Sequence, residues 1–191
     1  MNNKVVFFLM FFLLLYACSV EEEKNDNKTF IAKAGLANEY ETSRQTLDAE
    51  ISKNADNITA LIARGNLALE NYDFSNAFSD AARAFRLDSN NFQSRLLYAR
   101  SLINRPTSTE NDKIVAQRHF LKLVNEDANN LDAIVGLANT YALLQDFENA
   151  NIWIEKALKI DSKCIDAYRL KGSIFKIRYY AVIEDSDSKK F

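Results

Sequence analysis

The order of polar and apolar residues predicts a short apolar leader, a polar linker and then a series of helices. An unbroken apolar run, Val5 to Leu15, follows the cationic Lys4. The next distinct stretch, Glu21 to Lys28, is polar throughout, a composition that cannot bury itself. From there on apolar residues recur at helical spacing, and four glycines and one proline are too few to separate many short strands. The pattern therefore predicts an all-helical domain.

Small residues return at regular intervals along this helical part. One series, with the intervals 34, 39 and 34, consists of Gly65, Ala99, Ala138 and Gly172. A second series, with the intervals 39 and 34, consists of Ala77, Ala116 and Ala150. Both lengthen by the same amount in the same unit, which indicates one insertion between Leu102 and Ala116, where Asn104 to Asn111 supply turn-forming residues. A period of this length is typical of stacked helix pairs.

The repeat predicts helices at 58–70, 74–87, 92–104, 112–124, 131–143, 147–160 and 165–178. The small residues are expected to let paired helices approach closely. The larger apolar residues expected to fill the space beside them are Leu61, Phe74, Phe78, Ile134, Tyr141, Trp153 and Leu158. Asp73 and Asp146 directly precede helices, where a carboxylate can accept a hydrogen bond from an unpaired backbone N–H. In the last helix we expect Tyr168, Gly172 and Phe175 to face inward.

Two segments of the third unit carry a resemblance to the tetratricopeptide repeat, which extends from about Ile58 to Lys176. Leu137 to Tyr141 resembles the signature of the first helix, and Asp146 to Ala150 resembles the turn into the second. The chain departs from the family at the ends of its second helices, where it lacks the usual proline. The resemblance implies an all-α fold, an α-solenoid of tetratricopeptide-type helix hairpins with about three full repeats plus partial terminal units.

The leader pattern, the polar run and the repeat together predict an order of segments along the chain. We expect a lipoprotein signal peptide at 1–17, an acylated cysteine and polar linker at 18–28, a degenerate N-terminal helical unit at 29–57, repeats at 58–91, 92–130 (with the insertion) and 131–164, a capping helix at 165–180 and a tail at 181–191. The degenerate unit would pair Thr29 to Ala37 with a helix from Glu39 to Lys53. Apolar residues near the end, such as Tyr179 and Tyr180, leave three alternatives open: they dock back, bind a partner or reflect a truncated reading frame.

Cys18 follows the apolar run and suggests a lipid anchor. A cationic start, about a dozen apolar residues and a small residue at the cleavage site are typical of a secretory signal, which is too short to span a bilayer. Leu15, Tyr16, Ala17 and Cys18 resemble the lipobox of bacterial lipoproteins, although Tyr16 is larger than usual. The resemblance implies diacylglycerol and an acyl chain such as palmitate on Cys18, enough for stable anchoring. An ordinary signal peptide ending at a spare cysteine is the alternative.

Ser19 follows the cysteine, and resemblance to the enterobacterial sorting rule then favours the outer membrane over the inner one. We therefore expect a protein of the bacterial cell envelope that is lipid-anchored and faces the periplasm. The formal net charge of −2 gives no electrostatic reason to expect nucleic acid as a partner. Cys18 and Cys164 are the two cysteines, so a lipid on the first would leave no pair for an intramolecular disulfide.

No catalytic pattern is visible in the sequence. His119 is the one histidine, and no nucleophile is paired with it. The sequence has no glycine-rich phosphate loop and no cysteine and histidine spacing suited to zinc. We expect neither an enzyme nor a metal site, and no cofactor beyond the covalent lipid.

The tetratricopeptide resemblance implies a concave groove lined by the first helices of successive units. Matching the units gives the candidate protein-binding residues Asn66, Glu70, Arg100, Asn139 and Arg169. The two asparagines match the position that family members use to bond an extended peptide backbone, and the two arginines can pair with carboxylates. The chaperone-tail carboxylate clamp is not reproduced, because Ile62 stands where that clamp needs lysine. Plain solvated helix surface is the alternative for these residues.

Together these features favour a membrane-anchored interaction scaffold in envelope assembly or export, with a protein or an extended peptide as its partner. In plan it resembles repeat-containing lipoproteins of type IV pilus biogenesis, outer-membrane protein assembly or exopolysaccharide export. The alternative is an accessory or regulatory subunit of an envelope enzyme such as a peptidoglycan hydrolase. The sequence leaves the identity of the partner and the oligomeric state open.

Overall fold

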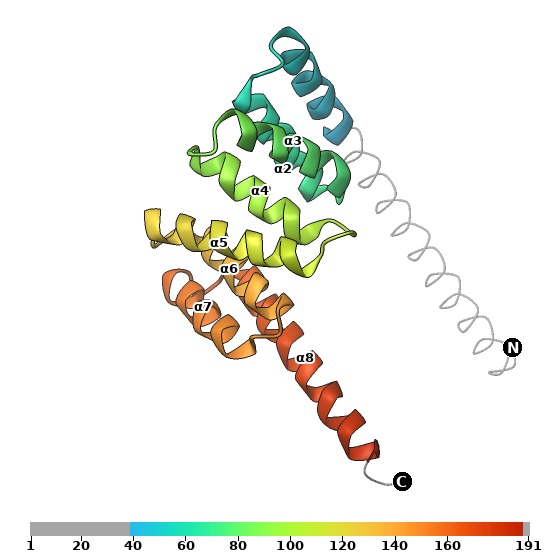
Figure 1. Cartoon of the computed structure of the whole chain (residues 1–191), viewed down its shortest axis with the longest axis vertical. Coiled ribbons are helices and arrows are strands. Elements are labelled where there is room, and N and C mark those ends of the chain that lie inside the picture. Colours follow the sequence, from blue (N-terminus) through green and yellow to red (C-terminus); the bar gives the residue numbers. More distant parts are fainter. Residues whose placement is uncertain (1–38, 189–191) are drawn as a thin grey trace, which may run out of the picture. The chain divides into compact units, whose positions relative to one another are not determined.

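Helices make up nearly all of the chain that the structure describes. The computed structural model describes residues 39–188, with side chains over 39–180. After a helix over 39–53 come α2 (Ile58–Glu70), α3 (Phe74–Leu87), α4 (Phe92–Asn104), α5 (Glu110–Glu126), α6 (Leu131–Leu143), α7 (Phe147–Ile160) and α8 (Ile165–Ser188) (Figure 1). Residues 39–188 contain no strand, so the all-α prediction is confirmed. No helix within this range has the length and apolar character needed to cross a bilayer.

The chain divides into two units, Met1–Thr46 and Leu47–Phe191. In the described part of the first unit, Arg44 donates a hydrogen bond of 2.8 Å to Glu41. In the second unit three hairpins, α2–α3, α4–α5 and α6–α7, are followed by α8, and each helix contacts the next. This is the predicted solenoid of tetratricopeptide-type hairpins. The predicted signal peptide, Cys18, the linker and the helix at 29–37 lie outside the described residues.

Each helix from α2 to α7 begins after a residue whose side-chain oxygen accepts a hydrogen bond from the backbone N–H three residues later. These caps are Asn57, Asp73, Asn91, Thr109, Asn130 and Asp146. The predictions for Asp73 and Asp146 are confirmed, and the other four caps were not recognised in the sequence. The first helix of every hairpin follows an asparagine, while the second follows an aspartate or a threonine. These caps fix where the helices begin, and five of the six starts predicted from the repeat agree with the structure.

Two helices are longer than predicted. Helix α5 begins at Glu110 instead of 112, because Thr109 and Asp112 form a capping box. The Thr109 N–H donates to Asp112 Oδ2 at 2.8 Å, and the Asp112 N–H donates to Thr109 Oγ1 at 3.2 Å. The insertion therefore lengthens a helix as well as a loop. Helix α8 continues to Ser188, past the predicted end at 178, because neither proline nor glycine follows Gly172 within it.

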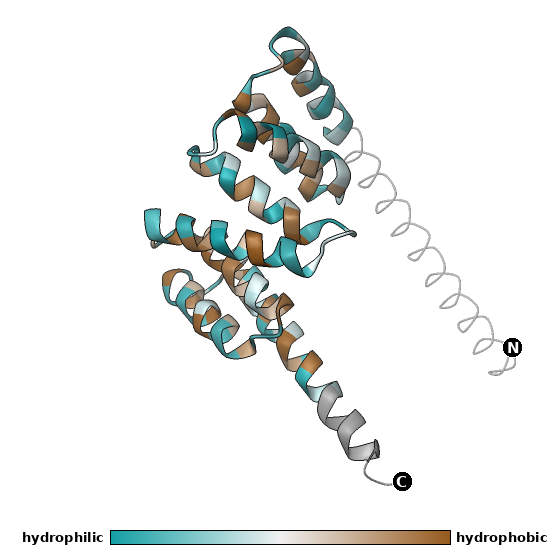
Figure 2. Ribbon diagram, viewed as in Figure 1, coloured by the Kyte–Doolittle hydropathy of each residue, from teal (hydrophilic) through white to brown (hydrophobic). Residues whose placement is uncertain are grey.

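The core lies between the stacked helices, which expose hydrophilic residues between their apolar ones (Figure 2). The most buried large apolar side chains are Leu61, Leu97, Phe120, Leu123, Ile134, Leu137 and Ile154. Of the predicted core residues, Leu61 and Ile134 have no exposed surface. The others pack against the core while partly buried: Phe74, Phe78, Tyr141, Trp153 and Leu158. Burying such faces between neighbouring hairpins is what stabilises a repeat protein.

The first three members of the series of small residues occupy close helix contacts, as expected. A Cβ atom added at Gly65 would lie 2.6 Å from Leu97 Cδ2, and Ala99 and Ala138 have no exposed surface. Gly172 is different, because a Cβ atom added there would meet nothing within 4 Å. The last member of the series therefore lies at an open surface.

The predicted inward face of the last helix is wrong. Tyr168 and Phe175 are 54% and 73% exposed, while the buried residues of α8 are Ala167 and Ile174. In the earlier units the equivalent positions are covered by the helices that follow. Within the described residues no helix follows α8, so its equivalent side chains face outward.

Candidate functional site

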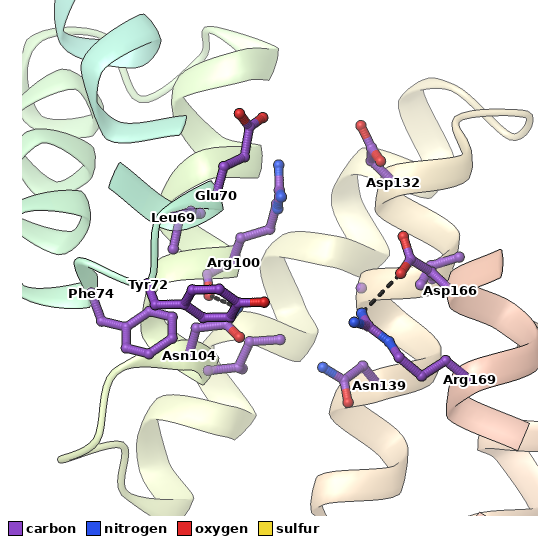
Figure 3. A pocket seen from close by; sticks show the side chains of 13 residues that line it. Leu69, Glu70, Tyr72, Phe74, Arg100, Asn104, Asp132, Asn139, Asp166 and Arg169 are labelled. Carbon is purple, nitrogen blue, oxygen red and sulfur yellow. Dashed lines mark hydrogen bonds and ion pairs between the residues drawn. The ribbon is translucent and has the colours of Figure 1, made fainter. Parts of the chain in front are cut away.

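The first helices of the hairpins, together with α8, line one side of the solenoid. Helix α2 contacts α4, α4 contacts α6 and α6 contacts α8. A hollow of about 400 Å³ opens along these four helices (Figure 3). Its lining side chains are Leu69, Glu70, Tyr72, Phe74, Arg100, Ile103, Asn104, Asp132, Val135, Asn139, Asp166 and Arg169. We call this hollow the groove.

Four of the five candidate residues line the groove: Glu70 on α2, Arg100 on α4, Asn139 on α6 and Arg169 on α8. The fifth, Asn66, lies one turn before Glu70 and does not line the hollow itself. Its carboxamide oxygen accepts a hydrogen bond of 3.4 Å from Arg100 Nη1. This contact is long for a hydrogen bond and uses only one of the donors of the guanidinium. The structure thus brings the five residues to one site, and their role in binding stays a prediction.

Charges of both signs face the groove. Arg169 Nη2 lies 2.8 Å from Asp166 Oδ1, but the two side chains are 76% and 60% exposed, so this pair is weak. Glu70 and Asp132 form no ion pair within the part of the chain whose side chains are described, and neither does Arg100. These carboxylates and this guanidinium are available to a ligand.

A smaller apolar hollow of about 250 Å³ continues the groove between α6 and α8. It shares Val135, Asn139, Asp166 and Arg169 with the first hollow. The side chains that it adds are mostly apolar: Ala142, Leu143, Leu170, Ser173, Ile174 and Ile177. Leu143 and Ile177 are 38% and 52% exposed, so they leave apolar surface uncovered. The first hollow therefore carries charged side chains from all four helices, while the second, between the later turns of α6 and α8, is mainly apolar.

The sequence interpretation missed several residues of the groove. Asp132 and Asp166 are separated by one repeat period, so the period that revealed the small residues could also have revealed these carboxylates. No sequence signal marked Tyr72, which enters the groove because its φ is 61° in the turn between α2 and α3. Its ring meets that of Phe74 edge-on, with centroids 6.1 Å apart (Figure 3).

His119 and Cys164 do not line the groove. The His119 ring packs edge-on against Phe85 and Tyr98, with centroid distances of 5.1 and 5.6 Å. Burial lowers the pKa of His119, and the nearby charges of Arg95 and Lys122 lower it further. Cys164 is a half-buried free thiol just before α8. Over the described residues, no group of histidine, cysteine, aspartate and glutamate side chains could hold a metal ion.

Several solved structures, two of them described as tetratricopeptide repeat proteins or domains, are similar to this chain in fold. The crystal structure of MamA matches with a TM-score of 0.58 at 14% identity, over 83% of this chain and 96% of MamA. A tetratricopeptide repeat protein from Parabacteroides merdae matches with a TM-score of 0.59 at 21% identity, over 74% of this chain and 54% of that protein. The first such domain of Spaghetti (RPAP3), bound to an HSP90 peptide, matches with a TM-score of 0.52 at 16% identity, over 64% of this chain and 93% of that domain.

No protein-family model matches the sequence, and no curated protein matches it. The identities to these three solved structures do not exceed 21%, so the matches establish the fold alone. Together with the capped hairpins and the groove, they define the chain as an α-solenoid with the tetratricopeptide-repeat fold.

Proposed function

We propose that this chain is a membrane-anchored interaction scaffold that binds an extended segment of a partner protein in its groove. The observation that carries this proposal is the continuous lining of the groove by four helices. Arg100, Asn139 and the carboxylate of Glu70 provide hydrogen-bonding groups along its polar part, and apolar side chains of α8 follow. A segment laid along the groove can satisfy these groups while it buries exposed apolar surface.

The similarity to the HSP90-peptide-bound domain of Spaghetti supports a peptide ligand as a class. It does not support the same peptide, because Ile62 is apolar and packs partly buried against the core in this chain. A ligand of this groove must instead carry cationic groups that pair with the carboxylates of Glu70 and Asp132 and an anionic group that pairs with the guanidinium of Arg100. A segment with charges of both signs, followed by an apolar side chain, has the required chemistry.

Photo-crosslinking tests the groove directly. With a benzoyl-phenylalanine at Asn139 we expect discrete crosslinked products in native envelopes. The same reporter at Arg118, an exposed residue of α5 that does not line the groove, should give none of them.

The double change Asn66→Ala with Asn139→Ala should weaken capture of the same products about tenfold at an unchanged Tm. Asn129→Ala, in an exposed turn, is the matched control. Identical products from both reporter positions would contradict the groove proposal.

The second part of the proposal is the anchor, with Cys18 acylated and the solenoid facing the periplasm, at the outer membrane in preference to the inner one. It is supported by the leader pattern and the lipobox resemblance of Leu15 to Cys18. Labelling with radioactive palmitate should mark the chain, and Cys18→Ala should abolish the label and move the protein from the membrane to the soluble periplasmic fraction. Cys164→Ala is the matched control, because it removes the other cysteine without changing the leader. Retention of Cys18→Ala in the membrane fraction would contradict the anchor.

A further inference from the structure

Among the described residues, none covers the outer face of α8 as equivalent positions of the other units are covered. We call this surface the open face and define it by Tyr168, Lys171, Gly172, Phe175 and Tyr179. Their spacing of three, one, three and four residues places them on one side of the helix. Tyr168, Phe175 and Tyr179 are 54%, 73% and 56% exposed.

The repeat shows what normally covers this surface. Gly65 is the equivalent of Gly172 in the first hairpin, and a Cβ atom added there would meet Leu97 of α4 at 2.6 Å and Asp80 Cβ of α3 at 3.4 Å. Two following helices therefore converge on that position. At Gly172 a Cβ atom would meet nothing within 4 Å. The open face is thus shaped to receive a helix at close approach.

A hollow of about 470 Å³, which shares Lys171, Phe175 and Tyr179 with the open face, supports this interpretation. It lies between α7 and α8 and is lined by Asn151, Lys171, Ile174, Phe175, Arg178 and Tyr179. Its walls are mainly apolar, and two cationic side chains stand among them. Figure 2 shows further hydrophobic residues along this part of α8.

The charge of the open face selects among helical partners. Lys171 is already paired with Glu155 of α7 at 2.6 Å. Arg178 and Lys176 form no ion pair with any residue whose side chain is described, and the Lys176 Nζ lies 6.0 Å from the centre of the Tyr180 ring. A helix that covers the apolar surface would bring its flanking side chains beside these cations. Carboxylates at those flanks would be attracted and ammonium groups repelled.

We propose that the open face of α8 binds an acidic amphipathic helix of a partner protein. The helix occupies the place that α3 takes beside α2, with a stripe of small and apolar residues against Gly172 and Phe175. Its carboxylates lie toward Lys176 and Arg178. This site touches the second groove hollow at Ile174, but it lies on another side of α8, because Arg169 and Ser173 line the groove hollows and Phe175 and Tyr179 line the other one.

Two peptides with the same apolar stripe and opposite charge test the proposal. Both are built on α7, whose buried residues Ala150, Ile154 and Ala157 form the stripe that packs in the third unit. In the acidic peptide Lys156 and Lys159 are replaced by glutamate, and in the basic peptide Glu148 and Glu155 are replaced by lysine. Binding to the full chain carrying Cys18→Ala is measured by fluorescence anisotropy at low and high salt. We expect the acidic peptide to bind at least ten times more tightly at low salt and this preference to shrink at high salt.

Variants of α8 locate the bound peptide. Gly172→Leu fills the place where the helix would approach and should reduce the affinity of the acidic peptide at least tenfold. Ser173→Leu adds the same bulk on the groove side of α8 and should leave the affinity unchanged. Both variants should keep the helical circular dichroism of the parent chain, because residues 172 and 173 are exposed.

Other results would overturn the proposal. Equal affinity for the two peptides, no binding of either one, or binding that Gly172→Leu leaves intact would each remove the acidic helix as the ligand. Sedimentation velocity showing a dimer that Gly172→Leu dissociates would assign the open face to a second copy. Binding to phosphatidylglycerol vesicles that Phe175→Ser abolishes would assign it to a lipid surface.

Discussion

Arg64 of α2 and Asp80 of α3 form a two-point ion pair that joins the first hairpin. Nε and Nη2 of Arg64 donate to the two carboxylate oxygens of Asp80 at 2.8 and 2.6 Å. The side chain of Asp80 is only 5% exposed. Arg64 Nη1 also donates to Asp48 at 2.6 Å. Asp48 precedes the hairpin in the same unit, so this contact links it to α2. Hydrogen bonds to Asp80 and then to Asp48 raise the pKa of Arg64 above its ordinary value, so it stays charged.

Replacing Arg64 should destabilise the chain strongly. We expect Arg64→Met to lower the free energy of unfolding by about 3–5 kcal/mol, because the Asp80 carboxylate is left buried without its partner. The double change Arg64→Met with Asp80→Leu should recover at least half of this loss, since no buried charge then remains. Urea unfolding followed by circular dichroism measures both. A double variant less stable than the single one would show that the loss of stability comes from the missing ion pair and not from an unpaired buried carboxylate.

Two glycines should respond in opposite directions to the same change. A Cβ atom at Gly136 would collide with the ring of Phe120, which has no exposed surface and cannot move aside. Gly136→Ala should therefore cost about 1–3 kcal/mol in spite of the better helix propensity of alanine. Gly172→Ala meets no atom and should gain about 0.5–1 kcal/mol. Thermal unfolding of the two variants provides the comparison, and a stabilised Gly136→Ala would contradict the observed packing.

Acid should weaken the start of α5. Arg105 Nη2 lies 2.7 Å from Asp112 Oδ2, and this contact, followed by the hydrogen bond from the Thr109 backbone, lowers the pKa of Asp112 to about 2 from 3.8. Because the folded pKa is the lower one, the stabilisation is complete above pH 3.8 and is lost as the pH falls toward 2. Asp112→Asn should cost about 1–2 kcal/mol at pH 7 and flatten the stability profile in that window. Urea midpoints between pH 2 and pH 6 measure the effect, and Asp127→Asn, outside the capping box, is the control.

His119 should produce a second pH dependence at higher pH. Burial, followed by the charges of Arg95 and Lys122, lowers the pKa of His119 from 6.5, so protonation of the ring is less favourable in the folded chain than in the unfolded one. The free energy of unfolding is therefore at its full value above pH 6.5 and falls as the pH drops through the lowered pKa, where the folded chain must take up the proton. His119→Phe keeps ring contacts with Phe85 and Tyr98 and should remove this dependence. Thermal midpoints from pH 5 to pH 7.5 test the prediction, and an unchanged profile in the variant would contradict it.

The sequence predicted much of the fold because its repeat records local requirements. A small residue such as Gly65 is needed wherever two helices approach closely, and a capping residue such as Asp73 is needed wherever a helix begins. Such requirements recur at the same place in each unit and are visible as a period. Matching the repeat units also predicts that Glu70, Arg100, Asn139 and Arg169 lie along one groove, and all four line it.

The features that the sequence did not predict depend on contacts between helices, and the repeat period does not describe such contacts. The pattern at Gly172 is the same as at Gly65, yet Tyr168 and Phe175 are exposed because no helix follows α8 in the described chain. The approach of Gly136 to Phe120 joins two helices through a pair of residues that have no counterpart in the series of small residues.

By itself the sequence determined the number, order and spacing of the described hairpins, because helix length, capping and close approach are set by residues near each other in the chain. Only the tertiary structure decided which faces are covered. It showed that the groove combines Glu70 and Asp132 with Arg100, that a mainly apolar hollow follows between α6 and α8, and that the described residues leave the open face uncovered. The exposure of a side chain depends on which other helices pack against it, and this packing exists only in the folded chain.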